Sequence, residues 1–314
     1  MRVLVTGADG FVGRHLVRAL VDQGHAVGAG CRPSGAPVDW GPRSGGVSPL
    51  ALELTQDASV RDALDWGGDA IVHLAAVASG REARDDPAWA WAVNAAGTAR
   101  LVAAIEARRE RSGADPRVLL VSTGEVYGMG RGVARLESDP LEPVSPYAAS
   151  KLGAEVVVME AWRRAGIRVL IARAFPHTGP GQTPRYALPG FVERLRAAAA
   201  SGRTTVGTGN LEPVRDTLDV RDVVAAYIAL LEQGVPGEAY NVSRGEGVSL
   251  AELFRRLVAL LDVRAQATPD PALFRRGDIL HLVGDSTKLR RATGWTPKIS
   301  LDATLWGLVH AEAD

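Results

Sequence analysis

The sequence predicts an α/β fold, built on a doubly wound parallel sheet with a smaller C-terminal lobe. Two observations support this. Short runs of Val, Leu, Ile and Ala alternate with helical patterns through the first half of the chain, and these runs are apolar throughout. Strands of that kind are buried on both faces, as they are in a parallel sheet covered by helices on both sides.

The predicted elements of the first half follow from spacing and turn residues. Strands are predicted at residues 2–6, 26–30, 50–54, 69–75, 117–122 and 167–173. A helix from Phe11 to Gln23 connects the first two strands, because Leu16 and Leu20 fall one turn apart and Gly24 closes the helix. The Gly-, Pro- and Ser-rich segment Pro33–Pro49 is typical of a loop.

A glycine-rich turn joins the first predicted strand to the first helix. Gly7, Gly10 and Gly13 form a Gly-x-x-Gly-x-x-Gly motif. In a dinucleotide-binding turn these glycines permit the tight turn, the approach of the backbone to a pyrophosphate and close helix packing. The helix N-terminus adds N–H groups and the positive end of its dipole. A plain turn is the alternative, but the strand–turn–helix context favours cofactor binding by a Rossmann-type sheet.

The end of the second predicted strand bears on the choice of cofactor. An acid there binds the ribose 2′-hydroxyl of NAD, whereas an Arg suits a 2′-phosphate. The segment Ala29–Ser34 contains no acid and places Arg32 directly after the strand. The alternative for Arg32 is a solvated loop position, because most Arg side chains are exposed. The sequence favours NADP(H), with NAD(H) as the alternative.

Tyr147 and Lys151 lie one turn apart on a helix predicted to extend to Trp162. Ser145 suits the N-cap and Pro146 the first helical position. An ammonium group favours a phenolate, so Lys151 is expected to lower the pKa of Tyr147 and to allow proton transfer near neutral pH. The alternative is a Tyr–Lys pair on a solvated helix surface.

A hydroxyl and a carboxylate follow the buried-strand pattern Val118–Val121. Thr123 and Glu125 come directly after it. Ligands of open parallel sheets bind at the carboxyl ends of the strands, so both side chains are expected at the ligand site.

Taken together, these motifs resemble those of the extended short-chain dehydrogenases/reductases. The resemblance covers nearly the whole chain and rests on the glycine turn, His73-Leu74-Ala75-Ala76, Asn94-x-x-Gly97-Thr98, Thr123 and Tyr147-x-x-x-Lys151. It implies that Thr123 hydrogen-bonds the substrate oxygen and that Tyr147 is the acid/base. It also implies that Lys151 lowers the pKa of Tyr147 and holds the nicotinamide ribose.

The resemblance further implies a set of cofactor contacts. Residues 74–76 are expected to line the cofactor cleft, and Glu53 stands where the family has an Asp that contacts the adenine. The full predicted set is Gly7, Gly10, Phe11, Val12, Gly13, Arg32, Glu53, Leu54, Leu74, Ala75, Ala76, Asn94, Tyr147 and Lys151.

The second half is similar to the GDP-6-deoxy-4-keto-mannose reductases and to the neighbouring GDP-mannose 4,6-dehydratases. The similarity lies in Arg173–Gln182, Gly209–Asp216, Asp219–Val223, Gly237–Val242, Asp270–Arg275 and Gly284–Leu289. It implies that Arg215 and Arg275 hold the nucleotide and diphosphate through bidentate bonds. Surface salt bridges are the alternative for both. His177 and Asn210 complete the predicted substrate-binding set.

Three positions near the predicted site depart from the family pattern. Pro176 replaces an Asn that contacts the diphosphate, and proline has neither an N–H nor a polar side chain. Gly124 stands where dehydratases commonly have Asp or Ser, and glycine cannot donate the proton that expels the 6-hydroxyl. Glu53 replaces the Asp already mentioned. Glu125 matches the glutamate that removes the C5 proton in dehydratases, but it also occurs in reductases.

The expected function is NADPH-dependent reduction of a nucleotide-linked 4-keto-6-deoxy sugar, with GDP as the nucleotide. Tyr147 would protonate the forming alkoxide while Thr123 orients it. The first alternative is a redox-neutral 4-epimerase, 4,6-dehydratase or decarboxylase that keeps its NAD(P) bound, with Glu125 as a catalytic base. A non-catalytic NADP(H)-binding sensor is disfavoured, because Thr123, Tyr147 and Lys151 are all retained.

Two lobes are predicted for the 314 residues. The Rossmann dinucleotide-binding domain comprises residues 1–174, with 215–245 returning to it, and the nucleotide-sugar-binding lobe comprises 175–214 and 246–314. Helices of the second half are predicted at 189–200, 219–233, 249–261 and 301–312. By the family resemblance, helices near 94–109 and from Tyr147 to Trp162 are expected to form a homodimer interface.

Composition excludes several other classes of function. The 36 Lys and Arg residues balance the 36 Asp and Glu residues, so no basic footprint for nucleic acid exists at whole-chain level. Cys31 is the single cysteine and the histidines are scattered, so neither an internal disulfide nor a metal site is expected. No apolar run approaches the ~20 residues that span a membrane. We therefore expect a cytoplasmic protein.

Overall fold

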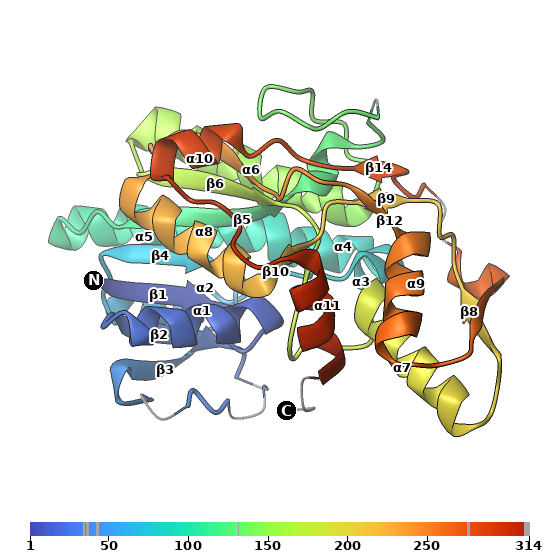
Figure 1. Ribbon diagram of the computed structural model, residues 1–314. Helices are drawn as coiled ribbons and strands as arrows, with labels where there is room; N and C mark the ends of the chain where they lie inside the picture. Colours follow the sequence, from blue (N-terminus) through green and yellow to red (C-terminus); the bar gives the residue numbers. More distant parts are fainter. Residues whose placement is uncertain (34, 36–37, 42–43, 131, 275–276, 311–314) are drawn as a thin grey trace.

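The computed structural model describes residues 1–314 except 34, 36–37, 42–43, 131, 275–276 and 311–314. Within this part of the chain, seven parallel strands form one sheet in the order β11-β6-β5-β4-β1-β2-β3 (Figure 1). Their bounds are β1 Arg2–Thr6, β2 Ala26–Cys31, β3 Val47–Ala51, β4 Ala70–His73, β5 Arg117–Thr123, β6 Val169–Ala174 and β11 Ala239–Val242. The strand order reverses between β1 and β4, where open parallel sheets bind their ligands.

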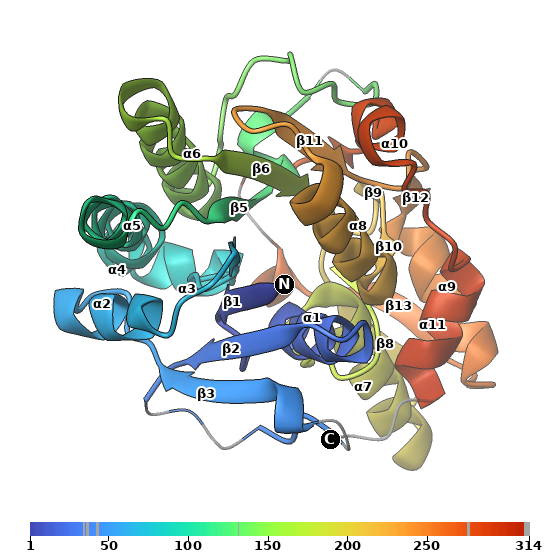
Figure 2. The same ribbon diagram turned by 90° about the vertical axis from the view of Figure 1, so that its left-hand side faces the viewer.

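Helices cover both faces of this sheet (Figure 2). One face carries α1 (Phe11–Asp22), α8 (Val220–Gln233) and α10 (Thr287–Thr293), and the other carries α2 (Asp57–Asp65), α5 (Gly97–Ser112) and α6 (Pro146–Ala165). Two separate apolar cores result, with Leu16 and Tyr227 in the first and Leu101 and Val158 in the second. The predicted doubly wound, Rossmann-type fold is confirmed.

Shorter elements lie between these strands and helices. The 3₁₀ turn η1 (Ser44–Gly46) precedes β3, and the 3₁₀ turn η3 (Gly124–Tyr127) follows β5. The helices α3 (Gly80–Asp85) and α4 (Pro87–Trp91) and the π-helical segment η2 (Ala92–Ala96) connect β4 to α5. The π-helical segment continues directly into α5, and π-bulges of this kind occur often at functional sites.

The later segments form a smaller cluster beside the carboxyl ends of the strands (Figure 1). Its helices are α7 (Ala187–Ala200), α9 (Leu250–Leu260) and α11 (Leu301–His310). Its strands are β7 (His177–Thr178), β8 (Thr205–Thr208), β9 (Val214–Arg215), β10 (Leu218–Asp219), β12 (Val248–Ser249), β13 (Gln266–Pro269) and β14 (His281–Leu282), with a 3₁₀ turn η4 at Pro271–Leu273. Phe191 and Phe254 meet edge to face at 5.3 Å in its apolar core, which also contains Leu195 and Leu305.

Three strands differ from their predicted bounds by two residues or more at one end, and β2 and β5 by one residue. The third strand is β3 at Val47–Ala51 instead of 50–54, so the predicted loop Pro33–Pro49 runs into the strand. Pro49 lies within β3, which is tolerated because β3 is an edge strand. Strand β4 ends at His73 instead of residue 75, because the chain turns there and the Leu74 N–H donates to the Thr6 carbonyl. Strand β6 covers 169–174 instead of 167–173.

A buried carboxylate ties the C-terminal segment to α8. Asp222 accepts hydrogen bonds from the backbone N–H groups of Lys298 (3.0 Å) and Ile299 (2.9 Å). Its own carbonyl accepts a bond from the indole N–H of Trp295 at 3.0 Å. These bonds fix the chain between α10 and α11.

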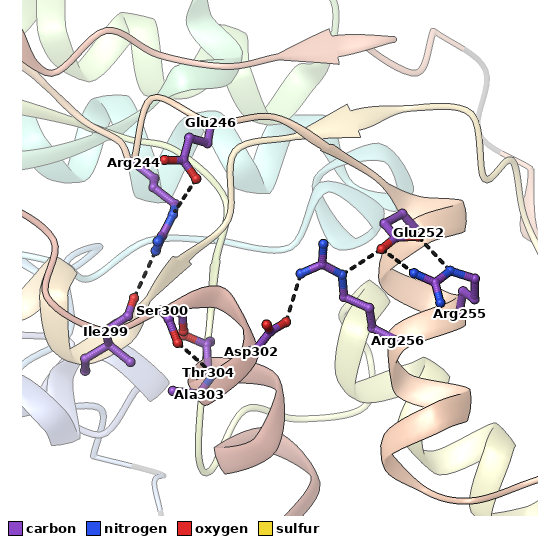
Figure 3. A network of polar contacts seen from close by, with 10 residues as sticks. All are labelled: Arg244, Glu246, Glu252, Arg255, Arg256, Ile299, Ser300, Asp302, Ala303 and Thr304. Carbon is purple, nitrogen blue, oxygen red and sulfur yellow. Dashed lines mark hydrogen bonds and ion pairs between the residues drawn. The ribbon is translucent and has the colours of Figure 1, made fainter.

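A second set of polar contacts lies nearby but is more exposed (Figure 3). Arg256 of α9 bridges Glu252 and Asp302 at 2.8 Å each and so joins α9 to α11. Arg244 donates to the Ile299 carbonyl at 2.9 Å. Because these groups are partly solvated, they contribute less to stability than the buried Asp222.

None of the described helices is long and apolar enough to cross a membrane.

We predict that Asp222→Ala lowers the free energy of unfolding by about 2 kcal/mol, because it leaves two partly buried N–H groups without their acceptor. Chemical denaturation followed by circular dichroism measures this change. Asp302→Ala is the matched control, and it should lower the free energy of unfolding by less than about 1 kcal/mol. Equal decreases in the free energy of unfolding of the two variants would contradict the conclusion that Asp222 contributes more to stability than the exposed contacts.

Candidate active site

The glycine turn after β1 is closed by backbone contacts that leave no room for side chains. Gly7 has a φ of +68°, and a Cβ there would lie 2.8 Å from the backbone of Ala75. A Cβ on Gly13 would lie 2.2 Å from the Gly7 carbonyl oxygen. Gly10 precedes α1, and no side chain caps the helix. The N–H groups of the first turn of α1 therefore suit a phosphate, as the spacing predicted.

The predicted cleft residues 74–76 are partly buried and follow β4. The Ala75 N–H donates to the Thr6 hydroxyl at 3.1 Å, which places this segment beside the glycine turn. Phe11 begins α1 and stacks on His177, with ring centroids 6.4 Å apart. Val12 packs against the first apolar core.

Glu53 and Leu54, both in the predicted cofactor-binding set, make contacts within the protein. Glu53 accepts bonds from the Thr55 N–H (3.0 Å) and hydroxyl (2.8 Å), so its carboxylate stabilises the turn that leads into α2. Leu54 is buried against Gly97, where a Cβ would lie 3.0 Å from the Leu54 Cβ. Arg32 follows β2 and is exposed. The Glu53 Oε1 is thus engaged by Thr55, and Leu54 has an apolar side chain.

A buried histidine connects the strand ends beneath the cleft. His73 is hydrogen-bonded to the Thr6 hydroxyl at 2.8 Å and to the Thr98 hydroxyl at 3.1 Å. Thr98 donates its own proton to the Asn94 carbonyl at 2.6 Å, so Nε2 of His73 carries the hydrogen and Nδ1 accepts from Thr6. Burial, aided by the Lys151 charge, lowers the pKa of His73 to about 3. His73 is therefore neutral and structural.

Asn94 lies in the π-helical segment and is buried. Its side chain accepts from the Val77 N–H (2.8 Å) and donates to the Val77 carbonyl (3.1 Å) and the Ser150 hydroxyl (2.9 Å). Ser150 in turn donates to the Tyr147 carbonyl at 2.8 Å. The Asn94 amide thus joins the segment after β4 to the first turn of α6, and its hydrogen-bonding groups are engaged within the protein.

Tyr147 and Thr123 meet above the carboxyl end of β5. The two side chains are hydrogen-bonded, and Tyr147 is partly buried in the first turn of α6. Burial raises the pKa of Tyr147, the nearby Glu125 and Tyr186 add to the rise, and the Thr123 hydrogen bond opposes it. The sequence predicted a pKa lowered by Lys151, and this is wrong for the structure described, because burial outweighs the favourable contacts.

Lys151 is buried one turn after Tyr147 on α6. Burial lowers its pKa to about 8, and the carboxylate of Glu155 opposes that change. Glu155 is itself buried and accepts bonds from the Ser122 hydroxyl (2.5 Å) and the Arg173 Nη2 (2.8 Å). Ser122 directly precedes Thr123 and Arg173 lies in β6, so Glu155 connects α6 to both strands.

Gly124 is enclosed by an aromatic ring. A Cβ on Gly124 would lie 3.0 Å from the ring of Phe175, and a Cβ on Gly284 would lie 2.5 Å from the same ring. Phe175 is buried and stacks on Tyr127 at 6.3 Å. The absence of a side chain at 124, noted as a departure in the sequence, therefore has a packing cause.

Each described residue of the predicted substrate set makes contacts within the protein. His177 donates its Nδ1–H to the Phe175 carbonyl (2.9 Å) and faces α1 through Phe11. Arg215 donates to Asp278 (2.8 Å) and to the Ile279 carbonyl (2.6 Å). Asn210 accepts from the Glu212 N–H at 3.0 Å. Arg275 lies outside the described residues.

Sequence reasoning missed three residues that shape the site: Glu155, Phe175 and Asp9, whose Oδ2 lies 3.7 Å from the Arg32 Nε. Glu155 follows Lys151 by one helical turn, a spacing that could have suggested an ion pair. Asp9 and Phe175 gain their roles from partners far along the chain, so no local signal identifies them. Among the described residues, no group of three or more His, Cys, Asp or Glu side chains could hold a metal ion.

The fold and this arrangement of Thr123, Tyr147 and Lys151 define an extended short-chain dehydrogenase/reductase. The family model described as "GDP-mannose 4,6 dehydratase" matches residues 4–306, and the chain belongs to that family. The chain is 33% identical to GDP-6-deoxy-D-mannose reductase of Pseudomonas aeruginosa over 309 residues, which cover 97% of this chain and 94% of the relative.

Two solved structures show the same fold and different cofactors. The structure of RMD from Pseudomonas aeruginosa, complexed with NADPH, has a TM-score of 0.83 and 31% identity, and the match covers 98% of this chain and 97% of that one. UDP-glucose 4-epimerase of Thermus thermophilus, in complex with NAD, has a TM-score of 0.86 and 29% identity, with 98% of both chains covered. The predicted family and the class of NAD(P)-dependent nucleotide-sugar enzyme are confirmed.

We predict that Glu155→Gln lowers the pKa of Lys151 below about 8, because the variant removes the carboxylate that favours the ammonium. Lys151 is charged below its pKa and neutral above it. If its ammonium holds the cofactor, affinity for reduced cofactor falls as pH rises through about 8 in the wild type, and at lower pH in the variant. Cofactor fluorescence titrated across pH measures both midpoints.

Glu160→Gln is the matched control, because Glu160 lies on the same helix and pairs with the exposed Arg164. The pH at the midpoint of the change in cofactor affinity should be the same in this variant as in the wild type. Identical midpoints in all three proteins would show that Glu155 does not set the charge of Lys151.

Proposed function

We propose that this protein is an NADPH-dependent reductase of a nucleotide-linked 4-keto-6-deoxy sugar, with GDP as the nucleotide. The hydrogen-bonded pair of Thr123 and Tyr147 at the carboxyl end of β5, with the buried Lys151 one helical turn further along α6, carries this proposal. The similarity to a reductase named for a GDP-6-deoxy sugar supports the choice of substrate class. Under this proposal, Glu125 borders the sugar as an additional polar group.

The proposed chemistry assigns one task to each residue. Thr123 orients the 4-keto oxygen by a hydrogen bond, and Tyr147 transfers its phenolic proton to that oxygen as it becomes an alkoxide. Lys151 supplies positive charge beneath the phenol and holds the ribose of the cofactor. A reduced nicotinamide, when bound in the cleft, would supply the hydride for C4. The raised pKa of Tyr147 suits this role, since the phenol is protonated before the reaction.

The proposed cofactor site consists of the glycine turn, residues 74–76 and the exposed Arg32. NADP(H) is proposed because no acid ends β2 and Arg32 follows the strand directly. The lobe assignment is also proposed: residues 1–174 with 215–245 bind the cofactor, and 175–214 with 246–314 bind the nucleotide sugar, except that α10 packs on the large sheet. Arg215 must then leave Asp278 or share its guanidinium to reach a diphosphate.

A redox-neutral reaction is the second candidate, and Glu125 favours it. This carboxylate lies close enough to Tyr147 to raise its pKa, so it could act as a base on the same sugar. An epimerase or dehydratase would retain oxidised cofactor between turnovers, whereas a reductase releases it. The cofactor content of the purified protein therefore separates the two candidates.

We predict stoichiometric oxidation of NADPH when the protein is mixed with a GDP-4-keto-6-deoxy-hexose, measured by loss of absorbance of the reduced nicotinamide. Tyr147→Phe should lower kcat by about 100-fold or more, because it removes the proton donor. The affinity of that variant for NADPH should remain within about twofold of the wild-type affinity, which would show that the site still forms. Absence of oxidation, together with release of bound oxidised cofactor on denaturation, would reject the reductase and favour the redox-neutral candidate.

We also propose a cytoplasmic homodimer with α4, α5 and α6 at the two-fold axis. Large apolar side chains are exposed on this face, namely Val156 (62%) and Trp91 (46%). Trp91 packs over Gly153 of α6, where a Cβ would lie 2.7 Å from the indole ring. An apolar surface that joins two helices in this way suits an isologous interface.

Val156→Arg is predicted to shift the protein from dimer to monomer, because it buries an unpaired charge at the interface. Analytical ultracentrifugation at several concentrations measures the mass. Val235→Arg, at a position that is 54% exposed and outside these helices, is the control and should leave the mass unchanged. A monomeric wild type at all concentrations would reject the proposed dimer.

A further inference from the structure

The glycine turn places a carboxylate at the end of β2, where the sequence of β2 itself has none. Asp9 lies between Gly7 and Gly10, and the Ala8 N–H donates to the Gly30 carbonyl at 3.1 Å. This backbone bond joins the turn to β2. The Asp9 Oδ2 then lies 3.7 Å from the Arg32 Nε. The Asp9 side chain is only 14% exposed, whereas that of Arg32 is 73% exposed.

Neighbouring groups confirm that the Asp9 carboxylate faces this corner. A Cβ on Gly35 would lie 3.3 Å from the Asp9 Oδ2 and 3.1 Å from the Arg32 carbonyl oxygen. The Gly35 N–H donates to that carbonyl at 2.9 Å, so Arg32 and Gly35 lie close together beside the carboxylate. The Asp9 charge also interacts electrostatically with the thiol of Cys31, the last residue of β2. Burial raises the pKa of the Cys31 thiol to about 11, and Asp9 contributes to the rise.

In dinucleotide-binding folds the end of the second strand contacts the adenosine ribose. An acid at this place accepts a bond from the 2′-hydroxyl of NAD, and an Arg accommodates the 2′-phosphate of NADP. This protein has both groups at the same place, the acid from the glycine turn and the Arg from the segment after β2. An incoming 2′-phosphate must therefore replace Asp9 as the partner of Arg32 and lie close to a like charge.

We propose that Asp9 is the residue that limits the preference for NADPH: it accepts the ribose hydroxyl of NADH, repels the 2′-phosphate of NADPH and competes with it for Arg32. This inference rests on the proposed function only in that Arg32 binds the 2′-phosphate. It predicts a protein that accepts both cofactors, with a smaller preference for NADPH than Arg32 alone would give. Asp9 is a specificity determinant that acts at the ribose and not at the reacting carbon.

The test compares cofactor affinities of the full-length protein and its Asp9 variants. Asp9→Asn keeps the size of the side chain and its ability to accept from a hydroxyl, but it removes the charge. We expect NADPH to bind about tenfold more tightly and NADH about threefold more weakly. Isothermal titration at one fixed ionic strength measures both constants, because salt screens the phosphate interaction. The pair 2′,5′-ADP and 5′-ADP repeats the test with ligands that differ only in the 2′-phosphate.

Two further variants identify the source of any change. Asp65→Asn removes one negative charge from an exposed pair with Arg111 at the far end of α2, and both affinities should stay within about twofold of the wild type. Asp9→Ser removes the charge with a smaller polar side chain and should shift the NADPH to NADH ratio in the same direction as Asp9→Asn. Thermal unfolding of each variant verifies that the turn has folded.

Arg32→Gln distinguishes this inference from the proposed cofactor preference. Suppose that Arg32→Gln weakens the binding of NADPH about tenfold and leaves the binding of NADH unchanged, while Asp9→Asn leaves the ratio of the two affinities unchanged. Asp9 then plays no part, and the inference is overturned. Equal shifts of both cofactors in Asp9→Asn would also overturn it, because Asp9 would then act only through the shape of the turn. If Arg32→Gln leaves NADPH unchanged, the proposed NADPH preference fails instead.

Discussion

The buried carboxylate of Glu155 is the group on which the geometry of the candidate site depends. It accepts from Ser122 on β5 and from Arg173 on β6, and it attracts Lys151 on its own helix. Burying each ion costs several kcal/mol unless its partners remain in place, so any displacement of α6 against the sheet is opposed. Because Ser122 adjoins Thr123, the same contacts fix the distance between the strand end and the first turn of α6.

Burial also sets the charges in this part of the molecule. His73 is neutral, Tyr147 remains a phenol, and Lys151 has a pKa of about 8, in each case chiefly because water is excluded. Helical spacing alone suggested that Lys151 would favour a phenolate, but spacing carries no information about solvent. Tyr147 is therefore in the protonated form that a proton donor needs before an alkoxide forms beside it.

Local signals explain what the sequence predicted well. The glycine turn and the start of α6 at Pro146 follow from chemistry within a few residues, so their positions were predictable. The position of β3 was not, since its edge location tolerates Pro49 and the Gly-rich segment before it obscures the boundary. The two-residue strands of the smaller lobe exist only through their partners. The pairing of Asp9 with Arg32 and the stacking of Phe11 on His177 likewise join residues far apart in sequence.

The contact between Gly124 and Phe175 links packing to the type of reaction. A Cβ at 124 would lie 3.0 Å from the buried ring of Phe175, and a Cβ at 284 would lie 2.5 Å from the same ring. A side chain at 124 therefore requires this ring, which stacks on Tyr127 at 6.3 Å, to shift by a few tenths of an ångström. The elimination step of a dehydratase that relies on an Asp at this position has no acid here, because position 124 is a glycine packed against that ring. Hydride transfer to a ketone needs no such group.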